Sequence, residues 1–153
     1  EEVFRLKEEE WSVADDEYVL HQVFQVVRAF SKTLNNEIYR SGIYSAEWTV
    51  LTTVYKGKIQ QQSDLIQYLA LEPGAISRTL TKMEQKGLIR RSYRENERGK
   101  FIELTEKGLQ LRQALEEQVN AHRQRVLQGI SVAERQQLKK VMSALQKNLA
   151  AEE

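Results

Sequence analysis

The 153-residue chain has no cysteine, a single proline and no long run of apolar residues. Without cysteine it forms neither disulfides nor thiolate metal sites, and it has no thiol for redox sensing. A transmembrane helix needs about 20 consecutive apolar residues, so none is expected. The opening residues, Glu1-Glu2-Val3-Phe4-Arg5, lack the basic flank and apolar core of a signal peptide, so none is expected there either.

Histidine is also scarce. His21 and His122 are the only two, and the helical pattern places them on different helices without a carboxylate at ligand spacing, so no metal site is predicted. His122 falls on an apolar stripe and is predicted to be a packing residue. The chain has no glycine-rich phosphate loop, no Gly-x-Ser-x-Gly elbow and no His-Glu-x-x-His motif. We therefore predict no catalytic residue and no cofactor, and an enzyme is the remotest of the functions considered.

The composition, 41% apolar and 29% charged, is typical of one folded domain. The net charge of +1 conceals an uneven distribution. Residues 1–55 carry a net charge of −5, residues 56–100 carry +5 and residues 101–153 carry +1. A basic middle segment indicates a surface for a polyanion, although charge alone fits chance clustering on a solvated helix face equally well.

Apolar residues recur every three or four positions through most of the chain, which predicts amphipathic helices. The predicted helices span residues 12–40, 45–56, 61–69, 73–86 and 105–128, and a last one starts after the Ser131-x-x-Glu134 capping box. In the second helix, the residues predicted to face inward are Trp48, Leu51, Thr52 and Tyr55. Ile59 is predicted to form a strand of one or two residues.

The pattern changes after Gly87. Residues 88–93 and 100–104 have roughly alternating apolar positions and flank a polar loop, which predicts a two-stranded hairpin. A short helix, a tight turn, a second helix and a basic hairpin make a winged helix-turn-helix. The predicted fold class is therefore mainly α with a small β-hairpin wing (α+β), in which residues 45–104 form the winged helix-turn-helix lobe.

The second helix of such a motif enters the major groove of DNA. Ile76, Leu80 and Met83 point inward on residues 73–86, while the opposite face presents Arg78 and Thr81. Arginine makes a bidentate contact to guanine, and a serine or threonine hydroxyl can bond a base or a phosphate. The alternative is an ordinary polar helix face.

The predicted DNA contacts fall into groups by role. Small residues at the tip of the second helix allow close approach to the base edges, and the first residues of the preceding helix hold a phosphate. Basic residues at the base of the wing lie beside phosphates, and Arg98 at the wing tip enters a minor groove. Glu95 and Glu97 make a solvated turn an alternative for the tip, or they pair with the wing arginines. The full predicted set is Gln62, Ser63, Gly74, Ala75, Ser77, Arg78, Thr81, Lys82, Arg90, Arg91, Arg94, Asn96, Arg98 and Lys100.

These residues resemble the MarR family of bacterial transcription regulators. The resemblance rests on the runs Asp64-Leu65-Ile66, Leu71-Glu72-Pro73-Gly74-Ala75-Ile76-Ser77-Arg78 and Met83 to Arg91, with Arg98 and Leu104-Thr105-Glu106-Lys107-Gly108 after the wing. Members usually carry an Asp-x-Arg signature in the wing, where this chain has Asn96-Glu97-Arg98. Asn96 can hydrogen-bond but cannot act as a charged partner, so we expect the change to affect the rigidity of the wing more than its DNA contact.

The resemblance implies a cytoplasmic homodimer, in which residues 1–44 and 105–153 form the helical dimerisation region. The apolar stripes of the first and last helices indicate the same independently, because the winged helix alone cannot cover them. A helical subdomain that buries them internally is the alternative. A two-fold dimer reads a near-palindromic operator, and the predicted role is that of a repressor.

The resemblance also implies release from DNA by a small anionic or phenolic ligand. The predicted ligand-binding residues are Arg28, Tyr39, Arg40, Tyr44 and Trp48, whose rings can stack and whose guanidinium groups can bind a carboxylate. Outside this class, the competing hypothesis is a winged-helix module that binds a protein partner and does not touch DNA.

Overall fold

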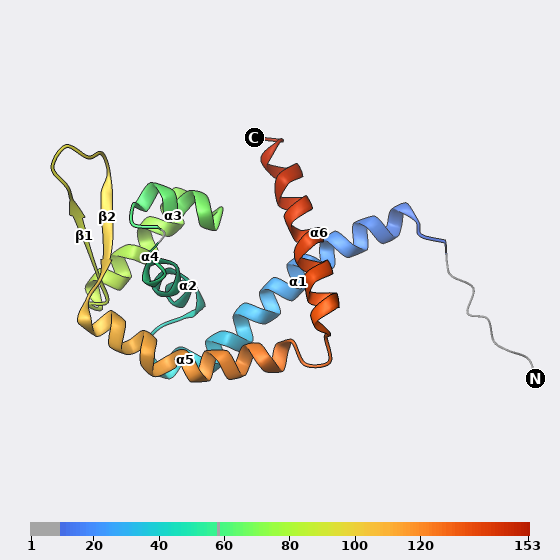
Figure 1. The fold of residues 1–153 in the computed structure, drawn as a ribbon, viewed down its shortest axis with the longest axis horizontal. Helices are drawn as coiled ribbons and strands as arrows, with labels where there is room; N and C mark the ends of the chain where they lie inside the picture. The colour runs from blue at the N-terminus through green and yellow to red at the C-terminus, as the bar shows by residue number, and fades with distance from the viewer. Residues whose placement is uncertain (1–9, 58) are drawn as a thin grey trace, which may run out of the picture. The chain divides into compact units, whose positions relative to one another are not determined.

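The structure is a computed structural model that describes residues 10–57 and 59–153. The start of the chain, where we looked for a signal peptide, lies outside the described residues. The chain divides into two compact units, one that ends at Val119 and one that covers Asn120–Glu153. The first unit contains helices, a two-stranded antiparallel sheet and most of helix α5 (Glu106–Val126), which continues into the second unit (Figure 1).

Helix α1 spans Val13–Ile38, and its start follows from the residues that precede it. The Ser12 hydroxyl accepts from the backbone N–H of Asp15 at 3.3 Å, while the Asp15 carboxylate accepts from the backbone N–H of Ser12 at 2.7 Å. This reciprocal pair satisfies two backbone donors that a helix start otherwise leaves open. A 3-10 turn, η1 (Tyr39–Ser41), follows, and Gly42 ends it at a φ of 90°. The first helix and its end are therefore as predicted.

Helix α2 spans Ser45–Tyr55, and its buried face differs from the prediction at one end. Trp48 and Leu51 are buried as predicted, but Tyr55 is 52% exposed and Val54 takes the inward place. Helix α2 packs against α1, α4 and β2, and Val50 and Val54 are buried while Tyr55 faces solvent. The phenol ring of Tyr55 instead lies under the Arg112 guanidinium, 3.8 Å from the ring centre.

Helices α3 (Gln62–Leu69) and α4 (Pro73–Gln85) form the predicted helix-turn-helix. Ala70 ends α3 in the left-handed region at a φ of 51°, which turns the chain tightly toward α4. Pro73 occupies the first turn of α4, where its missing N–H costs no hydrogen bond. Leu65 of α3 is fully buried, and it anchors the short helix to the core.

Strands β1 (Ile89–Tyr93) and β2 (Lys100–Leu104) form the predicted hairpin. Their register pairs Ile89 with Leu104 and Tyr93 with Lys100. Ile59 does not form the predicted strand. An isolated bridge instead joins Gln61 to Phe101, and the Gln60 carbonyl accepts from the N–H of Ile102 at 2.7 Å. These hydrogen bonds connect the start of α3 to β2.

Thr105 begins α5 as predicted, since its hydroxyl accepts from the N–H of Gly108 at 3.1 Å. Gly129 separates this helix from α6 (Val132–Ala150), and Ser131 accepts from the N–H of Glu134 at 3.1 Å, which is the serine half of the predicted capping box. No residue of α6 is buried within the single chain.

One hydrophobic core joins these elements in the first unit. Its fully buried members include Leu51, Leu80, Met83 and Ile102, which come from α2, α4 and β2. A half-buried ion pair lies at its edge, where Lys86 Nζ is 2.6 Å from Oε2 of Glu47 and 2.8 Å from the carbonyl oxygen of Gly42. Because Glu47 is only 4% exposed, this lysine compensates a carboxylate that has left water.

Candidate nucleic-acid interface

Helix α4 separates its side chains into a buried face and an exposed face. Ile76, Leu80 and Met83 are at most 2% exposed, while Arg78 and Thr81 are exposed on the other side. The hydrophobic positions recur every three or four residues, so packing one face against the core presents the polar face to solvent. The part of the motif predicted to enter the major groove is therefore available to a ligand.

The other predicted DNA-binding residues are also mostly at the surface. The exposed ones are Ser63, Gly74, Arg78, Thr81, Lys82, Arg90, Arg94, Asn96, Arg98 and Lys100. Those with partly buried side chains are Gln62, Ala75, Ser77 and Arg91. All of them belong to α3, α4 or the hairpin, which contact one another through β2 and β1.

Gly74 leaves room for the guanidinium of Arg78 at the tip of α4. A Cβ atom at Gly74 would lie 3.2 Å from Nη1 of Arg78. That separation is tighter than most carbon contacts, so a larger residue would displace the end of the arginine. Gly74, which is predicted to permit close approach to DNA, thus also leaves the space that the Arg78 guanidinium occupies.

Arg91 is placed differently from its neighbour Arg90. Its guanidinium lies among Glu84, Thr81 and Gln62, whereas Arg90 is exposed. The charge of Glu84 balances that of Arg91, which the sequence did not indicate because the two residues lie on a helix and a strand. Glu84 is accordingly a member of this surface that the sequence analysis missed.

The wing loop turns through backbone geometry. The N–H of Glu97 donates to the carbonyl of Arg94 at 3.2 Å, and Asn96 and Gly99 have positive φ values of 62° and 83°. Asparagine adopts the left-handed region more readily than other side chains that have a Cβ. Asn96 therefore shapes the turn, and its side chain makes no hydrogen bond with any residue that the structure describes.

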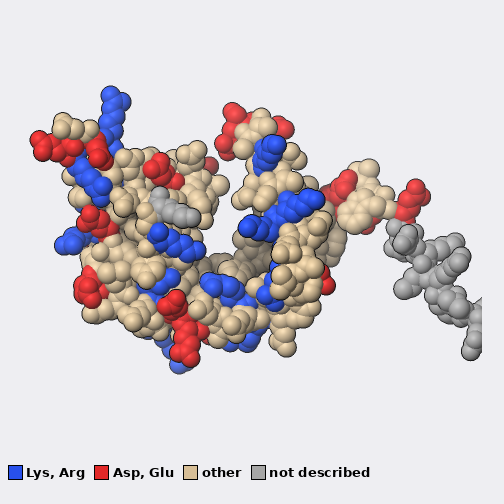
Figure 2. Space-filling view, in the orientation of Figure 1, with Lys and Arg blue, Asp and Glu red and all other residues tan. Residues whose placement is uncertain are grey.

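The acidic residue that pairs with Arg94 of the wing is Glu103 on β2, and the loop residues Glu95 and Glu97 do not take this place. Arg94 lies 3.7 Å from Glu103 and 4.0 Å from the ring centre of Phe101, so it lies against β2. Across residues 10–57 and 59–153, Glu95 and Glu97 form no ion pair. Figure 2 shows basic and acidic side chains close together over the hairpin. Arg98 has no partner in that same part of the chain, which leaves its charge available.

The five residues predicted to bind a ligand lie in different surroundings. Trp48 is buried in the core, Tyr44 is 55% exposed, and Arg40 donates to the hydroxyl of Tyr39 at 3.2 Å. Arg28 lies along a shallow groove of α1 with Ser31, Lys32 and Asn35.

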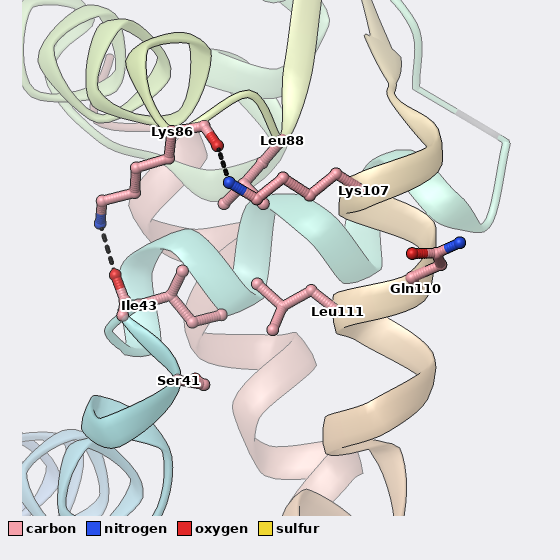
Figure 3. Close-up of a pocket in the computed structure, with 8 residues that line it drawn as sticks. Ser41, Ile43, Lys86, Leu88, Lys107, Gln110 and Leu111 are labelled. Carbon is pink, nitrogen blue, oxygen red and sulfur yellow. Dashed lines mark hydrogen bonds between the residues drawn. The ribbon is translucent and has the colours of Figure 1, made fainter.

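A cavity of about 440 Å³ lies elsewhere in the first unit, beside the ends of η1 and α4 and the start of α5. Figure 3 shows Lys86 and Lys107 on its border, with Lys86 Nζ bonded to the Gly42 carbonyl and Lys107 Nζ bonded to the Lys86 carbonyl. The rest of its lining is Ser41, Gly42, Ile43, Leu88, Gln110 and Leu111. The sequence analysis missed this site, because its residues come from three separate segments.

His21 is at the surface of α1 and His122 is 4% exposed on α5. The described residues contain no group of three His, Cys, Asp or Glu side chains that could hold a metal ion. None of the helices in residues 10–57 and 59–153 is long and apolar enough to cross a membrane.

Comparison with known proteins defines the class. Residues 45–108 match the family model of the winged helix DNA-binding domain. The HTH-type transcriptional regulator YwoH of Bacillus subtilis (strain 168) is 29% identical over 91 residues, which are 60% of this chain and 66% of YwoH. The match thus spans just under two thirds of that relative. Residues 45–108 are therefore a winged helix DNA-binding domain, and the chain resembles transcriptional regulators.

Solved structures identify the fold more narrowly. The transcriptional regulator PA3341 is 29% identical, with a TM-score of 0.77 over 88% of this chain and 99% of that one. A MarR family regulator from Listeria monocytogenes, solved with a 26mer DNA, is 22% identical, with a TM-score of 0.78 over 87% and 89%. The chain has the fold of the MarR family of transcriptional regulators, and the resemblance found in the sequence is confirmed. These relatives are regulators and not enzymes, in agreement with the prediction that the chain catalyses no reaction.

Proposed function

We propose that the chain is a homodimeric repressor in the bacterial cytoplasm that binds a near-palindromic operator in double-stranded DNA. The observation that carries this proposal is the exposed face of α4, where Arg78 stands beside a glycine opposite a fully buried apolar face. A helix held in this way can insert its polar face into a major groove without losing its own packing. Residues 45–104 are then the reading lobe, and residues 1–44 and 105–153 are the dimerisation region.

Within α4, Arg78 makes the bidentate contact to guanine, and Ser77 and Thr81 reach neighbouring bases. Gly74 and Ala75 let the helix tip approach the base edges. This assignment is supported by the exposure of Arg78 and by the space that Gly74 leaves for its guanidinium.

Around the helix, phosphate contacts fix the register of the protein on DNA. Lys82, Arg90 and Lys100 supply them from α4 and the wing, and Gln62 and Ser63 supply them from the start of α3. Arg98 enters the minor groove at the wing tip, where Asn96 shapes the turn. Arg94, the first residue of the wing loop, also contacts DNA, although Glu103 and Phe101 hold it against β2.

The test is DNA binding by the full chain at several salt concentrations, after bound sites have been selected from random double-stranded DNA. The affinity of the wild type should fall steeply with salt, because each phosphate contact releases counterions. Arg78→Ala should weaken binding by about 1–3 kcal/mol and relax preference at one base pair, whereas Lys82→Ala should weaken all sequences alike. A salt-independent affinity, or equal effects of Arg78→Ala on cognate and random DNA, would contradict the proposal.

Dimerisation is supported by apolar side chains that the single chain leaves in solvent. On α1, Leu20, Phe24 and Val27 are each more than 50% exposed, and α6 contains no buried residue. Helices that expose so much apolar surface mark association faces. We expect Phe24→Glu with Val27→Glu to convert the dimer to a monomer in light scattering, whereas Gln25→Glu, on the same helix, leaves the dimer intact. A dimer that tolerates both glutamates would refute α1 as part of the interface.

Release by a small anionic or phenolic ligand is the remaining part of the proposal. The cavity beside Lys86 and Lys107 supports it, since it combines apolar lining with the ammonium group of Lys107, while the charge of Lys86 is balanced by Glu47. A thermal shift screen of phenolic acids should identify compounds that stabilise the folded chain. If this cavity holds the compounds, they should no longer stabilise Lys107→Met. If they bind instead at the residues predicted from the sequence, such as Arg28 and Tyr44, they should stabilise Lys107→Met as much as the wild type.

A winged-helix module that binds a protein partner is the competing function. It predicts that Arg78→Ala and Arg98→Ala leave partner binding intact, and that no double-stranded DNA is enriched in the selection.

A further inference from the structure

The guanidinium of Arg91 lies in a polar network built by β1, α3 and α4. Its Nε donates to Oε1 of Glu84 at 2.8 Å, and Nη2 donates to the same oxygen. Nη2 also donates to Oγ1 of Thr81 at 2.9 Å, and Nη1 makes a longer contact of 3.5 Å with Oε1 of Gln62. These contacts use four of the five N–H donors that a guanidinium carries. The side chain is only 11% exposed.

The adjacent Arg90 is a natural comparison. Successive side chains of a strand point to opposite faces, so Arg90 and Arg91 face in different directions. Arg90 is exposed, and its side chain makes no hydrogen bond or ion pair within the part of the chain that the structure describes. The charge of Arg90 is therefore free for a phosphate, whereas the charge of Arg91 is already balanced by Glu84.

The network also determines what the Thr81 hydroxyl can offer. A hydroxyl has one O–H donor and two acceptor lone pairs. Thr81 donates its proton to the carbonyl of Ser77 at 2.9 Å, and it accepts from Arg91. One lone pair and the methyl group remain for DNA. Phosphate oxygens only accept hydrogen bonds, so they cannot use that lone pair.

In the major groove, the hydrogen-bond donors are the amino groups of adenine and cytosine. A threonine that can only accept therefore selects these two bases over guanine and thymine at the position it faces. If Arg91 were removed, Thr81 could rotate, regain its proton for another acceptor and lose this selectivity.

We propose that Arg91 is a positioning residue that holds the Thr81 hydroxyl as an acceptor, so that Thr81 selects a base amino group in the operator. Arg91 itself does not contact a phosphate. This inference rests on the proposed entry of α4 into the major groove.

The first measurement is the salt dependence of operator binding by the full chain. In Arg90→Ala, the slope of log affinity against log salt should fall by about 0.9, as expected for the loss of one phosphate contact. In Arg91→Ala, the affinity should fall while the slope stays at the wild-type value, because no counterion release is lost. A slope that falls as much in Arg91→Ala as in Arg90→Ala would overturn the proposal.

The second measurement uses Glu84→Gln, which keeps the shape of the side chain and removes its charge. If Arg91 contacted a phosphate, loss of the competing carboxylate would tighten DNA binding. If Glu84 holds Arg91 in position, Glu84→Gln weakens binding even though a negative charge has left the surface. Tighter binding by Glu84→Gln is therefore evidence against the proposal, and it can be measured even if Arg91→Ala does not fold.

The third measurement is base preference in selected sites. The wild type should prefer adenine or cytosine by about tenfold at one position of each half-site, as a single base contact provides. Thr81→Val and Arg91→Ala should each lose this preference, the double variant should lose nothing more, and Arg90→Ala should retain it. A preference that survives Arg91→Ala refutes this inference alone, whereas a wild type that enriches no DNA refutes the proposed function as well.

Discussion

Gly108 is the position where one added methyl group should be most costly. It lies in the first turns of α5 and is buried against Leu88, in the turn between α4 and β1. A Cβ atom at Gly108 would be 2.2 Å from the carbonyl oxygen of Leu88 and 3.1 Å from its carbonyl carbon. No side-chain rotation relieves this contact, because the atoms that the Cβ meets belong to the backbone of Leu88.

Two effects of opposite sign decide the outcome of Gly108→Ala. Alanine in a helix interior is ordinarily favoured over glycine by about 1 kcal/mol. Here, however, the Leu88 carbonyl must move by about 1 Å, although it is held by the N–H of Thr105 at 3.0 Å and belongs to a residue that is 1% exposed. Overpacking costs about 1–3 kcal/mol, and more when backbone is displaced. We expect a net loss of about 3 kcal/mol.

The assay is thermal unfolding of the full chain. A loss of about 3 kcal/mol corresponds to a fall in Tm of roughly 6–12 °C for a chain of this size. Gly74→Ala is the matched control, because its Cβ meets only the flexible end of Arg78 at 3.2 Å. We expect this control to keep or raise Tm while it weakens DNA binding. An unchanged or higher Tm for Gly108→Ala would show that the backbone contact is not constraining.

Two further predictions concern charged groups. Lys86→Met removes the partner of Glu47, whose side chain is 6% exposed, and should lower the free energy of unfolding in a denaturant titration by about 3 kcal/mol, as for other buried pairs broken on one side. Lys107→Met loses only a bond to the Lys86 carbonyl and should lower it by less than about 1 kcal/mol. The Ser12 hydroxyl and then its backbone N–H donate to Asp15 and hold the pKa of that carboxyl below its ordinary value. The contribution of this cap is therefore present at neutral pH and is lost as the pH falls through the lowered pKa. The protection factors of amides in the first turn of α1, which compare their exchange with that of an unstructured chain at the same pH, should fall below about pH 4 in the wild type. In Asp15→Ala these protection factors should be low at every pH, and equal protection in both proteins would contradict this role.

The order of elements follows from local patterns, which is why the sequence alone predicted it. Apolar residues three or four apart formed helices with Ile76, Leu80 and Met83 buried, and alternation with a polar loop formed the wing. Caps at Ser12 and Thr105 act within four residues of themselves, so their chemistry is visible in the sequence. The surface that faces DNA in our proposal follows from the same periodicity.

Contacts between distant segments were decided by the tertiary structure. The sequence assigned Tyr55 to the core and indicated no partner for Arg91, but Arg112 covers the ring of Tyr55 and Glu84 engages Arg91. Lys86 pairs with Glu47 across 39 positions, and neither residue type indicates which of many partners it will meet. Gly108 is the clearest case. The sequence marks it only as a glycine of the run after the wing, and the packing of α5 on the Leu88 carbonyl supplies the reason that no larger residue fits. Periodicity reports which face of an element is buried, whereas the partner across that face depends on how the elements pack.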